Sequence, residues 1–310
     1  MEEPKQVQKQ GQTQNQDQTA VDKPSSILGD GIRQFAKNKL AVISFGVVIL
    51  FILMGIFAPH IAPSNEDPIE PVLQRRLQPG IWEGNSETPL GTDSLGRDIL
   101  TRLIYGAQIS LRVGYVVIGI TAVFGITIGL IAGYFGGKID MIFMRFIDIM
   151  LSFPPLLLAL VVVAILGAGL ENAMLAIALV YIPQVARVVR SSVLKVREMP
   201  YIEACRAMGG SNFWIIISHV LPNILASAVV YLTLLLGDAI LYTAALGFLG
   251  IGIDPATPEW GAMLSDGRDY LLVGGWWVTL FPGVMIALTV LSFNLFGDGL
   301  REAFDPKMDL

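Results

Sequence analysis

Long apolar segments alternate with shorter polar ones along most of this chain. An apolar helix that crosses the roughly 30 Å hydrocarbon core of a bilayer needs about 20 residues. Six segments have this length and character, and they cover about residues 40–58, 113–134, 149–168, 172–189, 223–248 and 276–297. The fourth is the least regular, because Pro183 interrupts it and Arg187 closes it. The pattern predicts an all-α, polytopic membrane protein with six transmembrane helices.

The composition agrees with a membrane location. Of the 310 residues, 53% are hydrophobic, and the mean hydropathy is +0.61, which is more apolar than an average soluble domain. The net charge of −5 matters less than the positions of Lys and Arg, because short loops rich in these residues stay in the cytoplasm. Most of the 21 basic residues fall on one side if both termini and the loop after the fourth span are cytoplasmic. We therefore predict a multi-pass protein whose N- and C-termini are both cytoplasmic.

The N-terminal segment differs sharply from the rest. It is rich in Gln and has little apolar surface to bury, so residues 1–30 are expected to form a disordered cytoplasmic tail. About 40 polar residues precede the first apolar segment, which argues against a cleavable signal peptide. The expected divisions that follow are a lead-in and first span over 31–58, an extracytoplasmic segment over 59–108, a five-span core over 109–300 with a cytoplasmic loop at 190–222, and a cytoplasmic tail over 301–310.

The charged loop between the fourth and fifth spans carries the most informative pattern. Pro200 begins it, and Ile202 to Met208 has the character of a short helix. Glu203 near the start suits the positive end of the helix dipole, and Gly209 and Gly210 end the helix. The pattern indicates either a helix that lies in a groove of a partner or an ordinary connector between membrane helices.

The full spacing of this loop resembles a known motif. Glu203-Ala204-Cys205, Gly209 six residues after the Glu, and then His219-Val220-Leu221-Pro222-Asn223 are similar to the cytoplasmic "EAA" loop of ATP-binding-cassette importer permeases. In that family the loop docks as a coupling helix on the ATPase subunit. Two departures are visible, since Cys205 replaces the second Ala and His219 stands where the wider family has an aliphatic residue. The resemblance implies an ATPase-coupling role for Glu203, Ala204, Cys205, Ala207, Gly209, Leu221 and Pro222.

Other segments resemble the dipeptide, oligopeptide and nickel branch of this family, and together they cover about residues 30–307. The phrase Pro-Leu-Gly-Thr-Asp-Ser-Leu-Gly-Arg-Asp at residues 89–98 precedes the core in that branch and lies near the docking face for an extracytoplasmic binding protein. On physical grounds, Thr92, Asp93 or Ser94 can cap an amphipathic helix on the outer membrane surface. The apolar side of that helix would be formed by Ile99, Leu100, Leu103 and Ile104.

Two features inside the spans predict local geometry. Gly125, Gly129 and Gly133 lie four residues apart, and small residues at this spacing let helices pack backbone to backbone. The resulting seam belongs either to the transport core or to a contact without a part in transport. Phe153-Pro154-Pro155 interrupts backbone hydrogen bonding in the third span, which predicts a kink. The kink fits a position beside a translocation path and a purely structural role equally well.

Asp238 lies near the middle of the fifth span. A carboxylate in lipid costs at least ~2.5 kcal/mol, so its side chain should face the protein interior or a transport pathway. Related permeases tend to carry a Glu at the position of Thr243, and this chain departs from that pattern. Our hypothesis is that Asp238 meets the amino terminus of a peptide in the pathway. The alternative is a structural hydrogen bond to a neighbouring helix or to a partner subunit.

Catalytic functions find little support in the sequence. It has no phosphate-binding loop, no Gly-x-Ser-x-Gly elbow and no metal-ligand cluster, and its two histidines, His60 and His219, fall on opposite sides of the predicted membrane. We therefore predict a transport subunit that is not an enzyme, has no ATPase site of its own and carries no metal or other cofactor. ATP would be bound by partner subunits.

The resemblance implies the permease fold of type I importers in the cytoplasmic membrane of a prokaryote. The implied function is translocation of dipeptides or oligopeptides, driven by ATP hydrolysis on partner subunits and coupled through Glu203 to Gly209. The implied partners are a second homologous permease, two ATP-binding subunits, an extracytoplasmic solute-binding protein, the peptide and membrane lipid, without nucleic acid. Nickel or another small solute is the alternative cargo. A self-sufficient secondary transporter or channel is disfavoured, because the chain has no clear internal repeat and one candidate intramembrane charge.

Overall fold

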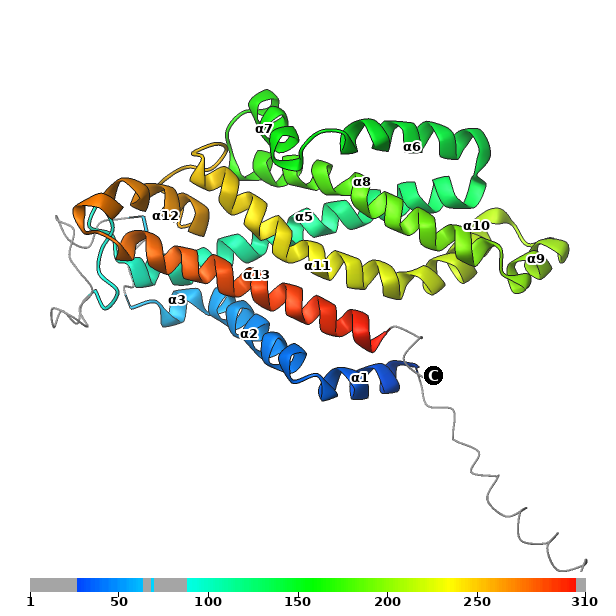
Figure 1. Ribbon diagram of the computed structural model, residues 1–310, viewed down its shortest axis with the longest axis horizontal. Coiled ribbons are helices and arrows are strands. Elements are labelled where there is room, and N and C mark those ends of the chain that lie inside the picture. Colours follow the sequence, from blue (N-terminus) through cyan, green and yellow to red (C-terminus); the bar gives the residue numbers. More distant parts are fainter. Residues whose placement is uncertain (1–26, 64–67, 70–87, 305–310) are drawn as a thin grey trace, which may run out of the picture.

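The computed structural model describes residues 27–63, 68–69 and 88–304, which form one elongated bundle of helices (Figure 1). Apart from an isolated β-bridge between Thr92 and Asp98, the regular structure of these residues is helical. The expected tail over residues 1–30 lies outside the described part, except for its last four residues, which are helical. The helices are α1 (Ile27–Lys37), α2 (Lys39–Ile56), α3 (Ala58–Ile61), α5 (Ile99–Phe135), α6 (Gly137–Leu151), α7 (Pro155–Leu166), α8 (Leu170–Arg197), α9 (Pro200–Ala207), α10 (Asn212–Ile215), the π-helix η1 (Ile216–Val220), α11 (Leu221–Phe248), α12 (Trp260–Gly267), the 3-10 helix η2 (Arg268–Val273) and α13 (Trp277–Ala303).

Five continuous helical stretches of the described chain are long and apolar enough to cross a membrane: α2, α5, α8, α13 and Asn212–Phe248. A sixth span exists if the bent pair α6 and α7 counts as one, because these two helices meet at an angle of 95°. The predicted third span over 149–168 is therefore not a straight helix. The kink expected at Phe153-Pro154-Pro155 is confirmed, since Phe153 and Pro154 lie between the two helices and Pro155 begins α7. Pro183, by contrast, is accommodated inside α8.

Helix α5 differs most from its prediction. It runs unbroken for 37 residues, so the outer amphipathic helix and the second span are one element. At 1.5 Å per residue it is about 55 Å long, which is much longer than a hydrocarbon core of about 30 Å. The cap is Asp98, which accepts a hydrogen bond from the Thr101 backbone N–H, and not Thr92, Asp93 or Ser94. The expected domain boundary at residue 108 falls inside this helix.

The ends of the bundle carry different segments (Figure 1). Helices α9 and α10 lie at one end, together with the turn between α5 and α6, whereas α3 and α12 lie at the other. Helix α1 and the last turn of α13 lie toward the end that carries α9. The two described chain ends and α9 thus share one side, as the predicted topology requires if that side is cytoplasmic.

The N-terminal helix is fastened to the last turns of α13. Phe35 packs edge-on against Phe296 with ring centroids 5.8 Å apart, and Phe45 stacks on the same ring at 5.2 Å. The Asn38 side-chain amide donates a hydrogen bond of 2.8 Å to the Glu302 carboxylate. Glu302 is therefore directed toward the start of α2.

The most extensive contact between two helices of the described chain joins α5 and α8. A Cβ atom added to Gly125 or Gly133 would come within 2.8 Å of Val185 or Val193 on α8. At Gly129 it would come within 2.7 Å of the Ala186 carbonyl oxygen. Real Cβ atoms avoid such distances, so only glycine permits this approach. The predicted seam is confirmed, and it joins α5 to α8.

Substitution of Gly129 should test this contact. Gly129→Ala gains helix propensity but forces α5 and α8 apart, and overpacking of this kind costs about 1–3 kcal/mol. We expect thermal unfolding of the detergent-solubilised protein to shift down by several degrees. Gly119→Ala on the same helix is the matched control, because its Cβ would meet nothing within 4 Å. Equal unfolding temperatures for the two variants would contradict the seam.

Candidate functional site

Helix α9 is a short helix at one end of the bundle (Figure 1). Pro200 occupies its first turn, where a missing N–H costs nothing, and Glu203 lies in the same turn. Gly209 follows with φ of +84°, a left-handed conformation that L side chains rarely adopt. The predicted helix and its glycine stop are confirmed. The expected loop 190–222 is shorter than predicted, because α8 runs to Arg197.

The two sides of α9 have different surroundings. Ile202 and Cys205 are 0% and 8% exposed and belong to the hydrophobic core built around α8 and α11. Glu203, Ala204 and Ala207 are exposed on the other side. Of the seven residues predicted to contact a partner, Cys205 therefore anchors the helix to its own subunit, and Leu221 packs half-buried against the same core.

Contacts from α5 hold this loop in place. The Arg197 guanidinium donates hydrogen bonds of 3.1 Å to the carbonyl oxygens of Gly133 and Tyr134 at the end of α5. The Tyr134 hydroxyl donates to the Asn212 side-chain oxygen at 3.0 Å, and the Arg206 guanidinium lies 5.1 Å from the centre of the Tyr134 ring. Displacement of α9 or α10 would therefore act directly on α5 and, through the glycine seam, on α8.

Large apolar side chains extend the exposed side of α9. Met208 and Phe213 are 78% and 76% exposed, and Trp214 is also exposed while its ring contacts His219 at 4.6 Å. Sequence reasoning missed Phe213 and Trp214, although adjacent aromatic residues in a polar loop are a recognisable signal. The predicted residues Leu221 and Pro222 begin α11, where Leu221 is half-buried and Pro222 is exposed.

Asp238 lies half-buried on α11, within reach of several polar side chains of the membrane-spanning region. Tyr181 on α8 and Tyr231, two helical turns away on the same side of α11, lie close enough to interact electrostatically with it. The Tyr181 hydroxyl is buried and has no hydrogen-bond partner among the described residues, and its ring packs edge-on against Tyr242. Within the same part of the chain, Asp238 itself makes no hydrogen bond or ion pair. A structural hydrogen bond within this subunit thus finds no support there.

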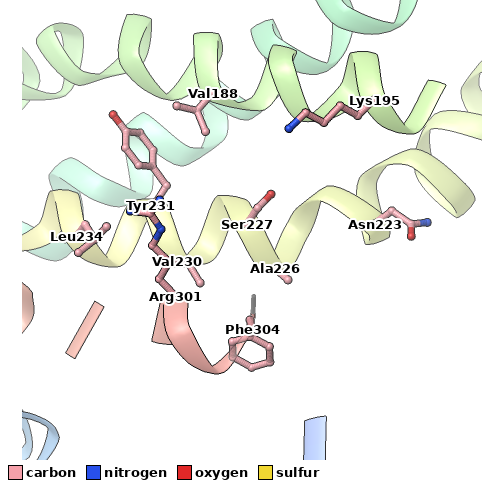
Figure 2. A pocket seen from close by; sticks show the side chains of 10 residues that line it. All are labelled: Val188, Lys195, Asn223, Ala226, Ser227, Val230, Tyr231, Leu234, Arg301 and Phe304. Atoms are coloured by element: carbon pink, nitrogen blue, oxygen red, sulfur yellow. The ribbon is translucent and has the colours of Figure 1, made fainter. Parts of the chain in front are cut away.

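A cavity of about 660 Å³ lies between α8, α11 and α13. Figure 2 shows Lys195 projecting into it from α8, Arg301 rising from α13 alongside α11, and the Ser227 hydroxyl pointing toward α8. The Tyr231 hydroxyl lies 3.4 Å from the Gln184 side-chain oxygen of α8. The lining residues are Val188, Lys195, Asn223, Ala226, Ser227, Val230, Tyr231, Leu234, Arg301 and Phe304.

A buried ionic network organises the opposite end of the bundle. Arg97 bonds to Asp93 and lies 3.1 Å from the Asp266 carboxylate, which belongs to α12. Arg102 lies 3.6 Å from Asp93 and donates a hydrogen bond of 3.2 Å to the Ala256 carbonyl oxygen. The arginines and Asp93 are almost completely buried. The charged part of the 89–98 phrase therefore holds the loops at this end of the bundle together within this subunit.

Two protein-family models match this chain. The family model described as a binding-protein-dependent transport system inner membrane component matches residues 125–310. The chain belongs to this family of inner membrane components. A second model, the N-terminal TM domain of oligopeptide transport permease C, matches residues 26–79 of this inner membrane component. The family expected from the motifs is confirmed.

Several curated relatives match nearly the whole inner membrane component. The dipeptide transport system permease protein DppC of Alkalihalophilus pseudofirmus is 49% identical over 279 residues, which are 90% of each chain. The protein of the same name from Haemophilus influenzae is 44% identical over 88% of this chain and 92% of its own. The glutathione transport system permease protein GsiD of Pectobacterium atrosepticum is 41% identical over 89% of this chain and 90% of its own.

A solved structure shares the fold of this inner membrane component. An inward-facing conformation of the MetNI methionine ABC transporter matches with a TM-score of 0.53 and 24% sequence identity. The match covers 65% of this chain and 96% of that chain. The expected all-α permease fold is therefore confirmed.

The stability of the protein should depend on the ionisation of Glu259, the buried residue that caps α12. Glu259 accepts a hydrogen bond of 2.9 Å from the Ala262 backbone N–H, and burial raises the pKa of its carboxyl above the ordinary value. Ionisation is thus costlier in the folded protein. The free energy of unfolding should be highest below the ordinary pKa and should fall as the pH rises through the raised one.

Two substitutions separate charge from capping at this position. Glu259→Gln keeps an acceptor oxygen but cannot ionise, so its thermal stability should not decline over this pH range. Glu259→Ala loses the cap and should be less stable by about 1 kcal/mol. The exposed Glu171→Gln on α8 serves as control and should retain the wild-type pH profile. If thermal stability changed with pH in the same way for the wild type and for Glu259→Gln, the pH dependence could not be attributed to Glu259.

Proposed function

We propose that this chain is the membrane-spanning permease subunit of an ATP-binding-cassette importer that carries dipeptides or oligopeptides into the cytoplasm. The two-sided structure of α9 is the main support for the mechanism. Ile202 and Cys205 fix the helix to the membrane core, while Glu203, Ala204 and Ala207 are left for a partner. Two of the relatives are named dipeptide transport system permease proteins, which supports a peptide as the transported solute.

In this proposal the exposed side of α9 docks into a groove of an ATP-binding subunit. The apolar side chains of Met208 and Phe213 are exposed to water in the isolated subunit. Docking would remove their apolar surface from water, which favours association with the partner. Closure of the ATPases on nucleotide moves α9 and α10, and the contacts of Arg206 and Asn212 with Tyr134 pass that movement to α5. Because α5 and α8 are locked at the glycine seam, the two spans move together and open the pathway to one side or the other.

The chain supplies the pathway but takes chemical energy from elsewhere. Two ATP-binding subunits hydrolyse ATP, a second homologous permease completes the pathway, and an extracytoplasmic solute-binding protein delivers the peptide. The end that carries α9, α1 and the last turn of α13 faces the cytoplasm, so both termini are cytoplasmic.

Asp238 is proposed to receive the ammonium group of the peptide inside the membrane. A half-buried carboxylate without a hydrogen-bond partner in the described part of the chain has unused acceptor capacity. An ammonium group forms charge-assisted hydrogen bonds with such an acceptor, which are stronger than neutral ones. The nearby hydroxyls of Tyr181 and Tyr231 provide further polar contacts in an otherwise apolar region.

Charge reversal on the exposed side of α9 tests the docking step. Glu203→Lys should reduce co-purification of the ATP-binding subunits at least about tenfold, because it changes the charge presented to the groove without altering buried residues. Lys138→Glu, at an exposed position of α6, is the charge-reversal control and should assemble normally. If the wild-type protein purifies without any ATPase, the importer assignment itself fails.

Removal of the Asp238 charge tests the pathway assignment. Asp238→Asn should reduce uptake of a dipeptide about tenfold or more, since a hydrogen bond to a charged group contributes roughly 1.5–3 kcal/mol. ATPase assembly should be unaffected. Thr233→Val, on the same helix, is the control, because the Thr233 hydroxyl donates its hydrogen bond to the Val229 carbonyl oxygen of its own helix. Unchanged dipeptide transport by Asp238→Asn would show that Asp238 does not receive the ammonium group of the peptide. Uptake of radioactive nickel in place of peptide would favour nickel as the cargo.

A further inference from the structure

The cavity between α8, α11 and α13 presents two positive charges to the same space. Lys195 and Arg301 line it from opposite walls, and its lining includes no acidic residue (Figure 2). Neither cation makes an ion pair with any residue that the structure describes. Both side chains are exposed to solvent, so each keeps its charge available for a charge-assisted hydrogen bond to an anion that enters this space.

Acidic residues one helical turn away do not neutralise these cations. Glu302 bonds to Asn38 at the start of α2, and neither Glu198 nor Asp298 lies within 4.0 Å of a basic group of the described chain. The volume of about 660 Å³ falls within the usual range for sites that bind small molecules. The charges therefore surround a space of the size that a small anionic ligand requires.

The hydroxyl groups beside the two cations indicate which further chemical groups the ligand should carry. The Ser227 hydroxyl donates to the Ile224 carbonyl oxygen and the Tyr231 hydroxyl donates to Gln184, so the lone pairs of both hydroxyls remain to accept hydrogen bonds. The ligand that fits has an anionic group and N–H donors, a combination that a peptide supplies. Val188, Val230, Leu234 and Phe304 give apolar surface for its side chains.

We propose that this cavity binds the C-terminal carboxylate of a peptide before its release to the cytoplasm, through Lys195 and Arg301. The inference rests on the proposed peptide transport. The cavity and Asp238 occupy successive positions along α11, because the lining there runs from Asn223 to Leu234 and Asp238 lies one helical turn, about 6 Å, further on. A dipeptide thus meets Asp238 and the basic pair in turn: the first takes its ammonium group, and the second its carboxylate.

Binding to the assembled complex tests the proposal without the solute-binding protein. The permease and ATPase subunits are reconstituted together in nanodiscs without ATP, and Ala-Ala, its C-terminal amide and its N-acetylated form are titrated by ligand-observed NMR. The free acid should bind about five- to tenfold more tightly than the amide. Lys195→Gln or Arg301→Gln should abolish that difference, and Lys138→Gln on α6 should preserve it.

Equal affinities for the acid and the amide in the wild-type complex would overturn the inference, as would the absence of measurable binding of either. So would equal losses for both peptides in the variants. Nanodiscs of phosphatidylglycerol and of phosphatidylcholine distinguish a lipid occupant. Phosphatidylglycerol retained by the wild type in native mass spectrometry and lost from Lys195→Gln, without acid–amide discrimination, would assign the cavity to lipid. ATP-driven uptake of Ala-Ala in the complete importer reports separately on the proposed function, which can stand when this inference fails.

Discussion

The close approach of α5 and α8 is the contact on which the rest of this structure depends. Three glycines bring the two backbones together, and Val185, Val189 and Val193 fill the grooves between them. Within lipid, apolar side chains have no hydrophobic driving force to associate, because the lipid tails are equally apolar. Close packing of the helices must therefore supply the attraction that the hydrophobic effect supplies in water. The seam also extends toward the end that carries α9, where Tyr134 contacts Arg206 of α9 and Asn212 of α10.

Much of the fold could be predicted because its signals are local. Apolar segment length located the spans, Phe153-Pro154-Pro155 located the bend, and the proline and glycines around Glu203 located α9. Each of these features depends on a few adjacent residues and on backbone geometry. The seam was equally predictable, because small residues four apart on a helix have one common use.

The remaining features depend on contacts between distant parts of the chain. The sequence around Asp98 contains several capping residues, and tertiary contacts of Arg97 and Arg102 decide where α5 begins. Cys205 lies within the motif, yet which side of α9 faces the core follows from the packing of α8 and α11. The cavity joins Lys195 and Arg301, more than a hundred residues apart, so no sequence window contains both.

The central claim is that the exposed side of α9 faces the cytoplasm and is covered by an ATPase, and a single cysteine tests it most directly. Ala204→Cys in a Cys205→Ala background places a thiol on that side. A membrane-impermeant maleimide should label it only in inverted vesicles, and assembly with the ATP-binding subunits should protect it. Labelling from the outer side, or full labelling in the assembled complex, would contradict the account.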